Sequence, residues 1–208
     1  LKPKCRYRGS RSSRGSLLES FWTRRNRDMQ LTRSALSDGK IWLDPATVEI
    51  CDGPYFDWMQ DPEVLRYLEA RFSDWTHEGL RSFVDACDRS PNQHLFAIRL
   101  LEGGRHVGNI KLQVDPHHNR GDIGILVGDS TLRDLGIGTS AICTICRYGF
   151  GTLGLAKVTA GCYAPNFASL KAFLRAGFTE EAIRPSHFFC DGVWVDGIFM
   201  GLLQNDER

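Results

Sequence analysis

Hydrophobic and polar positions follow two different periods along this chain, and the change of period predicts a succession of helices and strands. After Thr76 the apolar residues are spaced as on one face of a helix that this threonine can cap. That face consists of Leu80, Phe83, Val84 and Cys87. In the segment His106–Val114 apolar and polar residues alternate, which is typical of a strand with one buried face.

The same patterns extend over most of the chain. The predicted strands are Lys40–Leu43, Leu95–Leu101, His106–Val114, Asp122–Val127, Lys157–Tyr163, Thr179–Ile183 and Trp194–Leu203. The other predicted helices are Thr47–Met59, Pro62–Leu68, Thr139–Leu153 and Ala168–Ala176, the last with Gly177 as a left-handed cap. An antiparallel run followed by strand, loop, helix and strand predicts a mixed α/β sheet.

Charge divides the 208 residues unevenly. Residues 1–28 contain nine Lys and Arg against Glu19 and Asp28, so this segment carries +7 and the other 180 residues carry −6 of the net +1. A mildly acidic body argues against nucleic acid as the main partner. The basic segment has too little apolar surface to fold alone. It is a disordered tail, sequence upstream of a start at Met29, or a transit segment, and residues 29–208 are predicted to form a single domain.

No apolar run approaches the ~20 residues of a membrane helix, and no secretory signal pattern is present. The seven cysteines are scattered, and we expect them to be reduced in a cytoplasmic protein. Cys143 and Cys146 fall on one helix and are expected in the core. His117 and His118 lack further ligands at zinc spacing, so no metal site is predicted.

A glycine-containing loop, Arg133–Thr139, lies between a predicted strand and a predicted helix. Gly136 and Gly138 permit a tight turn with exposed amides, and the helix that follows adds its positive end, so the segment suits a pyrophosphate. An ordinary strand-to-helix turn is the alternative. A Rossmann fingerprint lacks its third glycine because position 141 is Ala, and no Gly-Lys-Ser/Thr of a Walker loop follows.

A second segment follows one helix and one strand later, where Asn166 can start a helix that ends near Gly177 and Phe178. Together the two segments resemble the GCN5-related N-acetyltransferases (GNAT) over roughly residues 41–203. The family pattern Arg/Gln-x-x-Gly-x-Gly/Ala matches Arg133 to Gly138, and its Asn-x-x-Ala/Ser with a later Gly-Phe matches Asn166, Ser169, Gly177 and Phe178.

The resemblance implies a mostly antiparallel sheet with a central splayed parallel pair, helices on both faces, and acetyl-CoA as cofactor. The residues expected to bind coenzyme A are Leu126, Val127, Gly128, Arg133, Asp134, Leu135, Gly136, Ile137, Gly138, Thr139, Asn166 and Ser169. The sequence looks closest to the branch of ribosomal-protein and sugar-nucleotide acetyltransferases.

Two residues are candidates for the chemistry. Asp122 begins the strand that leads to the loop, eleven residues before Arg133, and a carboxylate there could accept the amine proton through water. Its alternative is a strand-end carboxylate that pairs with Arg120 or caps the turn. The family's common general acid is a tyrosine where this chain has Phe173, so Ser169 is the candidate proton donor, with cofactor packing as its alternative.

The acceptor pocket is expected to use Tyr67 and Arg71, after the early helices, and His187 and Asp196, in the final hairpin, although surface or structural roles are open for each. We expect acetyl transfer to a primary amine, with a small molecule such as an amino-sugar nucleotide favoured. The alternatives are a ribosomal-type protein N-terminal acetyltransferase and a CoA-binding module without catalysis. A homodimer is a further expectation, with no nucleic-acid or membrane partner.

Overall fold

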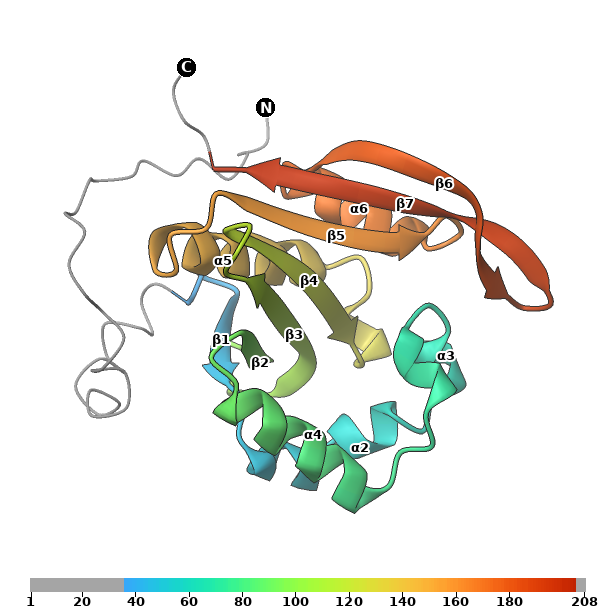
Figure 1. Cartoon of the computed structure of the whole chain (residues 1–208). Coiled ribbons are helices and arrows are strands. Elements are labelled where there is room, and N and C mark those ends of the chain that lie inside the picture. The colour runs from blue at the N-terminus through green and yellow to red at the C-terminus, as the bar shows by residue number, and fades with distance from the viewer. Residues whose placement is uncertain (1–35, 205–208) are drawn as a thin grey trace.

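A computed structural model describes residues 36–204 of the chain, so the predicted tail 1–28 lies outside the described residues. Seven strands form one sheet in the order β1-β2-β3-β4-β5-β7-β6 (Figure 1). Their bounds are Ile41–Pro45 (β1), Gln93–Leu100 (β2), His106–Asp115 (β3), Arg120–Val127 (β4), Lys157–Tyr163 (β5), Thr179–Cys190 (β6) and Val193–Leu203 (β7). Neighbouring strands are antiparallel except β4 and β5, which run parallel. The predicted mixed, mostly antiparallel sheet is confirmed.

The helical elements lie mainly in the connections before β2 and after β4. They are η1 (Val48–Asp52), α2 (Tyr55–Trp58), α3 (Pro62–Leu65), η2 (Glu69–Phe72), α4 (His77–Arg89), η3 (Ser130–Leu132), α5 (Ile137–Gly151) and α6 (Phe167–Arg175). Thr76 caps α4 by accepting from the amide of Gly79, as the pattern predicted. Gly177 has a φ of 100°, in agreement with its predicted left-handed conformation.

Two predicted helices are wrong in extent. The segment Thr47–Met59 forms two short elements because Gly53 and Pro54 interrupt it, and a proline has no amide to donate inside a helix. The segment Pro62–Leu68 is helical only to Leu65 and then leads into η2. The early helical region is therefore a series of short turns.

The final hairpin is longer than predicted. Strand β6 continues past Ile183 to Cys190, with an irregular register between Arg184 and Phe188. Pro185 lies within this irregular stretch, and β6 is the edge strand of the sheet, where a missing amide does not break a ladder on both sides. The hairpin β6–β7 consequently extends beyond the end of β5 (Figure 1).

Each face of the sheet carries its own apolar cluster. Helix α5 packs on one face with Ile110, Leu112, Ile123 and Val158. Helices α2 and α4, with η1, pack on the other face over Leu95 and Ala97. Figure 1 shows these helices on opposite sides of the sheet, which confirms helices on both faces.

The parallel pair is hydrogen-bonded only at its beginning. Arg120, Gly121 and Asp122 of β4 lie opposite Lys157, Val158 and Thr159 of β5. Beyond these positions β4 pairs only with β3, and β5 pairs only with β7. The two strands therefore diverge toward their C-terminal ends, as the expected splayed pair requires.

The cysteine prediction needs one correction. Cys143 is disulfide-bonded, so the expectation of reduced cysteines is wrong at this position. The free cysteines among the described residues are Cys51, Cys87, Cys146, Cys162 and Cys190. Cys146 is buried in the cluster around α5, as expected for a core residue. Within residues 36–204, no helix has the length and apolar character needed to span a membrane.

Candidate active site

A gap opens between β4 and β5 where the two strands diverge. Ile123 of β4 and Ala160 of β5 are buried on the α5 side. Since successive strand residues point to opposite faces, Asp122 and Gly124 face the other side together with Thr159 and Gly161. Both glycines are exposed, and an added Cβ at Gly124 would meet no atom within 4 Å. The surface of the gap is therefore open at these glycines. Asp122 lies at its closed end, where β4 and β5 are still hydrogen-bonded.

Asp122 is held at this closed end by its neighbour on β5. The hydroxyl of Thr159 donates to Asp122 Oδ2 at 2.8 Å and also lies 3.2 Å from the carbonyl oxygen of Gly121. Partial burial raises the pKa of Asp122, although the Thr159 hydrogen bond and the charges of Arg120 and Lys111 act in the opposite direction. A carboxylate with a raised pKa, beside an open floor, can accept a proton from an amine or from water.

Asp122 does not form the alternative ion pair with Arg120. Arg120 lies 3.5 Å from the carboxylate of Asp115, and Asp115 also accepts from the backbone amides of His117 and His118 in the turn. The turn is therefore closed by Asp115, which leaves Asp122 with Thr159.

The glycine-containing loop leads directly into helix α5. Gly136 is the residue before the helix and has a φ of 81°, a left-handed conformation that favours glycine. No side chain caps this helix start, so the first amides, at Ile137, Gly138 and Thr139, are available to an anion together with the positive end of the helix. Leu132 is buried and anchors the loop. Arg133, Asp134 and Leu135, which follow Leu132, are exposed.

A further positive charge lies at this loop, and sequence reasoning did not find it. The ammonium of Lys40 is 3.8 Å from the position that a Cβ at Gly136 would take. Lys40 precedes β1, almost a hundred residues before the loop in the sequence, so only the fold brings the two together. The loop amides and this lysine form a site suited to a pyrophosphate.

The end of β4 is covered by a tryptophan. A Cβ at Gly128 would lie 2.0 Å from the ring of Trp58 in α2, so the close approach of this ring requires glycine. Trp58 also contacts the ring of His106 edge-on, with 5.0 Å between centroids. Leu126, Val127 and Gly128 are half-buried beneath this layer. The indole thus lies against the strand segment predicted to carry the cofactor arm.

Helix α6 brings the second motif beside the first. Asn166 caps its own helix by accepting from the amide of Ser169 at 3.1 Å. An added Cβ at Gly138 would lie 3.8 Å from Ala172, so α6 passes close to the loop. Ser169 is half-buried. Phe173, at the position of the family's tyrosine, is 2% exposed and packs edge-on against Phe178 in the core.

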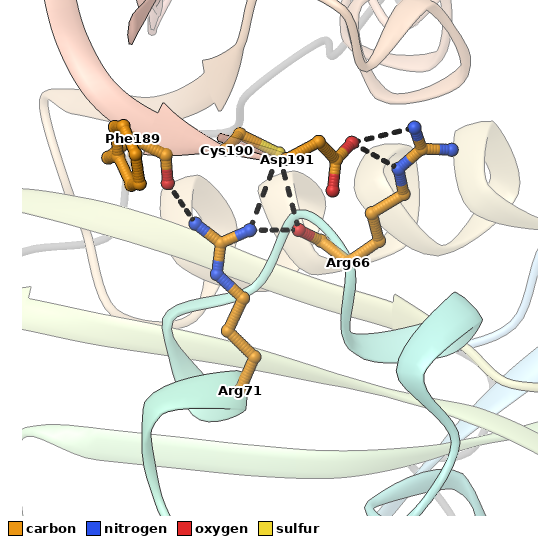
Figure 2. Close-up of polar contacts among 5 residues, drawn as sticks. All are labelled: Arg66, Arg71, Phe189, Cys190 and Asp191. Atoms are coloured by element: carbon orange, nitrogen blue, oxygen red, sulfur yellow. Dashed lines mark hydrogen bonds and ion pairs between the residues drawn. The ribbon is translucent and has the colours of Figure 1, made fainter. Parts of the chain in front are cut away.

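A layer over the C-terminal end of β5 contains the predicted acceptor residues Tyr67 and Arg71. The rings of Tyr67 and Tyr163 lie 5.8 Å apart. Arg71 donates to the carbonyl oxygens of Arg66 and Phe189, to the hydroxyl of Tyr163, and to Sγ of Cys190. Figure 2 shows Arg71 and Arg66 reaching from this layer to the end of β6. Arg71 therefore holds the layer to the hairpin, and its contact with an acceptor stays a prediction.

A second contact closes the same junction. Arg66 donates to Asp191 at 2.7 Å, and both side chains are about half exposed. A pocket lies beside this pair, lined by Gln60, Pro62, Leu65, Arg66, Arg71 and Asp191. The segment from α3 to η2 and the hairpin turn therefore form one continuous rim above the end of β5.

His187 and Asp196, the other predicted acceptor residues, lie in the irregular part of the hairpin. His187 is exposed and contacts the rings of Phe188 and Phe199. The Asp196 carboxylate accepts from the amide of Ser186 at 2.9 Å, which holds the distorted strand. Their direct contact with an acceptor stays a prediction.

Comparison with known proteins gives one family. The family model described as acetyltransferase (GNAT) domain matches residues 40–179. The Bacillus subtilis protein YjcK, named a probable N-acetyltransferase, is 32% identical over 73 residues, which cover 35% of this chain and only 40% of YjcK. Human alpha/beta-tubulin-N-acetyltransferase 9 is 26% identical over 167 residues, which cover 74% of this chain and 80% of the human protein.

Solved structures share the fold at low identity. A Vibrio cholerae spermidine N-acetyltransferase, in complex with CoA and spermine, superposes with a TM-score of 0.71 at 16% identity, covering 80% of this chain and 97% of the other. RimL, a ribosomal-protein alpha-N-acetyltransferase in complex with CoA, also has a TM-score of 0.71, at 13% identity, covering 80% of this chain and 95% of the other. At these identities the likeness establishes the fold.

Proposed function

This chain belongs to the GNAT acetyltransferase family, whose members are acyltransferases that use acetyl-CoA, and we propose that it acetylates a primary amine in the gap between β4 and β5. One arrangement carries the proposal. The gap has a carboxylate with a raised pKa at its closed end, Asp122, and β4 leads from there to the uncapped start of α5. The candidate base thus lies near the start of β4, and the candidate anion site lies at the start of the helix that follows this strand and η3.

The chain fits coenzyme A at the loop. Gly136 adopts the left-handed turn that exposes the amides of α5, and Lys40 adds positive charge beside it. Ile137, Gly138 and Thr139 would hold the pyrophosphate, and Leu126, Val127 and Gly128 would hold the arm. When bound, acetyl-CoA supplies the acetyl group as a thioester, which is reactive toward amines.

The amine must lose a proton before it can attack. Asp122 takes this proton, directly or through a water, and the hydrogen bond from Thr159 keeps the carboxylate in place. With acetyl-CoA bound, the amine nitrogen would bond to the acetyl carbon as the carbon–sulfur bond breaks. The nitrogen would lose its second proton to water as the amide forms, and the leaving thiolate would take up one proton. Phe173 cannot donate it. We keep Ser169 as the candidate donor, with water as the other source.

Two kinds of acceptor are considered, a small-molecule amine and a protein amino group. The relatives are named for a polyamine and for protein amino groups, and they give the amino-sugar nucleotide no support. We keep a small-molecule amine as the first candidate. A protein amino group is the second, because the human relative that matches 74% of this chain is named an alpha/beta-tubulin N-acetyltransferase. A single domain over residues 29–208, a homodimer and a cytoplasmic location also stay predictions.

The first experiment is a calorimetric titration of the folded protein with acetyl-CoA, with adenine nucleotides as controls. Saturable binding that prefers acetyl-CoA supports the cofactor site. Acetyl transfer is then measured over a panel of small amines and peptides with free N-termini. Binding without turnover on every amine would favour the alternative of a CoA-binding module. Absence of binding would contradict the proposal itself.

A further inference from the structure

Two glycines lie on the open side of the sheet, beside the gap. Gly161 of β5 is two residues from Thr159 and faces the same side of the sheet. Gly197 of β7 is paired with Tyr163 and also faces this side. Among the described residues, the apolar cluster beneath α2 and α4 includes no residue of β5, β6 or β7. These helices therefore leave this part of the sheet uncovered.

The ring of Phe199 lies over the two glycines. A Cβ at Gly161 would lie 3.3 Å from Phe199 Cε1, and a Cβ at Gly197 would lie 3.1 Å from its Cε2, so a larger residue at either position would crowd the ring. The guanidinium carbon of Arg184, on β6, lies 4.1 Å from the centre of the ring. His187 contacts the same ring edge-on, with 5.4 Å between centroids. Arg184 is thus held above β7, next to the β5 side of the gap.

The hydrogen-bond donors of Arg184 are available to a ligand. Within residues 36–204, Arg184 is not a member of the ion pairs that Lys and Arg form with carboxylates. The acid nearest to it along β6, Glu181, is bonded to Lys157 at 2.7 Å. A guanidinium that stacks on a ring uses its face and keeps the N–H groups at its edge free. Arg184 is exposed, so a ligand can reach these groups.

A second cation lies on the other side of the gap. Lys111 of β3 is paired with Gly124 of β4, and its ammonium lies 5.5 Å from the centre of the Phe83 ring of α4. Lys111 is close enough to Asp122 for its charge to act on that carboxylate. The gap therefore has a cation on each side and the single carboxylate of Asp122 between them.

These charges favour an acceptor with a negative group. Two cations against one carboxylate repel an additional positive charge on the acceptor and attract a negative one. The rim above the gap adds no net charge. Arg66 is paired with Asp191, and Arg71 is close enough to Glu69 for the two charges to interact. A guanidinium is also suited to a carboxylate, which it binds through two parallel hydrogen bonds.

We propose that the acceptor carries a carboxylate near its amine, and that Arg184 binds this carboxylate while the amine lies over the gap toward Asp122. The inference rests on the proposed function and specifies its acceptor as an amine with a negative group. Phe199 separates Arg184 from the gap by one strand spacing, roughly 5 Å, so the amine and the carboxylate are several bonds apart. Phe199 acts as a positioning residue, because it holds Arg184 and does not touch the reacting atoms.

The carboxylate belongs to a small amino acid or to an acidic side chain near the N-terminus of a peptide, and the test compares both sources. KM is measured for small ω-amino acids against their amides, and for peptides with glutamate in the second position against the same peptides with glutamine. We expect the wild type to prefer the carboxylate member of a pair. Arg184→Gln should raise KM for that member about tenfold, with KM for the amide member and for acetyl-CoA unchanged. The pair that shows the effect identifies the source.

Three further variants separate a binding role from a structural one. Arg184→Lys keeps the charge but cannot form two parallel hydrogen bonds, so the preference should weaken without disappearing. Phe199→Leu removes the ring that holds the guanidinium and should also weaken it. Arg175→Gln removes an arginine at the end of α6 and should leave the preference intact. The wild-type preference should decrease with added salt, because exposed charges are screened.

A preference that survives Arg184→Gln, or a wild type that does not prefer the carboxylate member of any pair, overturns the inference. Calorimetric binding of the amino acids and peptides, with coenzyme A present, keeps this result separate from catalysis. If binding depends on Arg184 but no amine is acetylated, the proposed function fails and the Arg184 site stands. If acetyl transfer occurs without dependence on Arg184, the proposed function stands and this inference fails.

Discussion

The hydroxyl of Thr159 donates to the carboxylate of Asp122 at 2.8 Å, across the short hydrogen-bonded part of the β4–β5 pair. This bond stabilises the ionised carboxylate, while burial favours the protonated one. Both effects act on the proton affinity of the group that we assign as the base. The strand register brings Thr159 to Asp122, and it therefore influences the pH range in which the enzyme is active.

Replacing Asp122 should reduce catalysis more than binding. Asp122→Asn keeps the shape and can still accept from Thr159, but it cannot take up the amine proton. We expect kcat to decrease about 100-fold with an unchanged Kd for acetyl-CoA, measured by steady-state kinetics and calorimetry. A wild-type kcat in this variant would exclude Asp122 as the base.

Replacing Thr159 should move the pH dependence. In the wild type, kcat/KM should fall as the pH decreases through the raised pKa of Asp122. Thr159→Val removes a hydrogen bond that lowers this pKa, so the acidic limb should shift to higher pH. The measurement is the pH profile of kcat/KM, and an unshifted limb would contradict the assignment. Thr131→Val, at a hydroxyl bonded to Asp129, serves as the matched control.

The same raised pKa has a consequence for stability. The folded state binds the proton of Asp122 more tightly than the unfolded state, whose pKa is near 3.8. Protonation of Asp122 therefore stabilises the folded state, and this stabilisation is lost as pH rises through the folded-state pKa of Asp122. Asp122→Asn should raise the melting temperature slightly at neutral pH, and this gain should vanish in acid. Calorimetric scans over pH test the sign, and a lower Tm at neutral pH would contradict it.

The role of the loop Arg133–Thr139 in cofactor binding can be tested by a substitution that its backbone does not accommodate. Gly136→Val places a β-branched residue at a φ of 81°, which costs about 1–3 kcal/mol and shifts the start of α5. We expect the affinity for acetyl-CoA to weaken at least about tenfold. Gly104→Val imposes a similar strain in the turn between β2 and β3, at a φ of 66° with open space around it. It should leave affinity unchanged, and equal effects of the two variants would show that the loop has no special role.

The two arginines at the hairpin junction should differ in their contribution to stability. Arg71→Ala leaves two carbonyl oxygens and the Tyr163 hydroxyl without a donor, and should lower the free energy of unfolding by about 2–3 kcal/mol. Arg66→Ala removes an exposed ion pair with Asp191 and should cost less than about 1 kcal/mol. Denaturant unfolding compares the two, and equal losses would contradict the different roles we assign them.

The sequence alone was sufficient to predict most of the strands and longer helices and the family, while the cofactor-binding role of the loop stays a prediction. Alternation in His106–Val114 predicted β3, and helical spacing after Thr76 predicted α4, because local periodicity determines which face is buried. The pairing of the Arg133–Thr139 segment with Asn166 and Ser169 predicted the family. These signals are short-range, so they can be read along the chain.

Only the tertiary structure decided which distant residues meet. Thr159 contacts Asp122 because the strand register aligns two segments that are 37 residues apart in the sequence. Lys40 lies beside Gly136 although almost a hundred residues separate them in the sequence. The contacts that Arg71 makes with Tyr163 of β5 and Phe189 of β6 could not be predicted either, since both partners lie more than ninety residues away in the sequence. Long-range contacts depend on how all the strands pair in the sheet, and no local sequence pattern determines that arrangement.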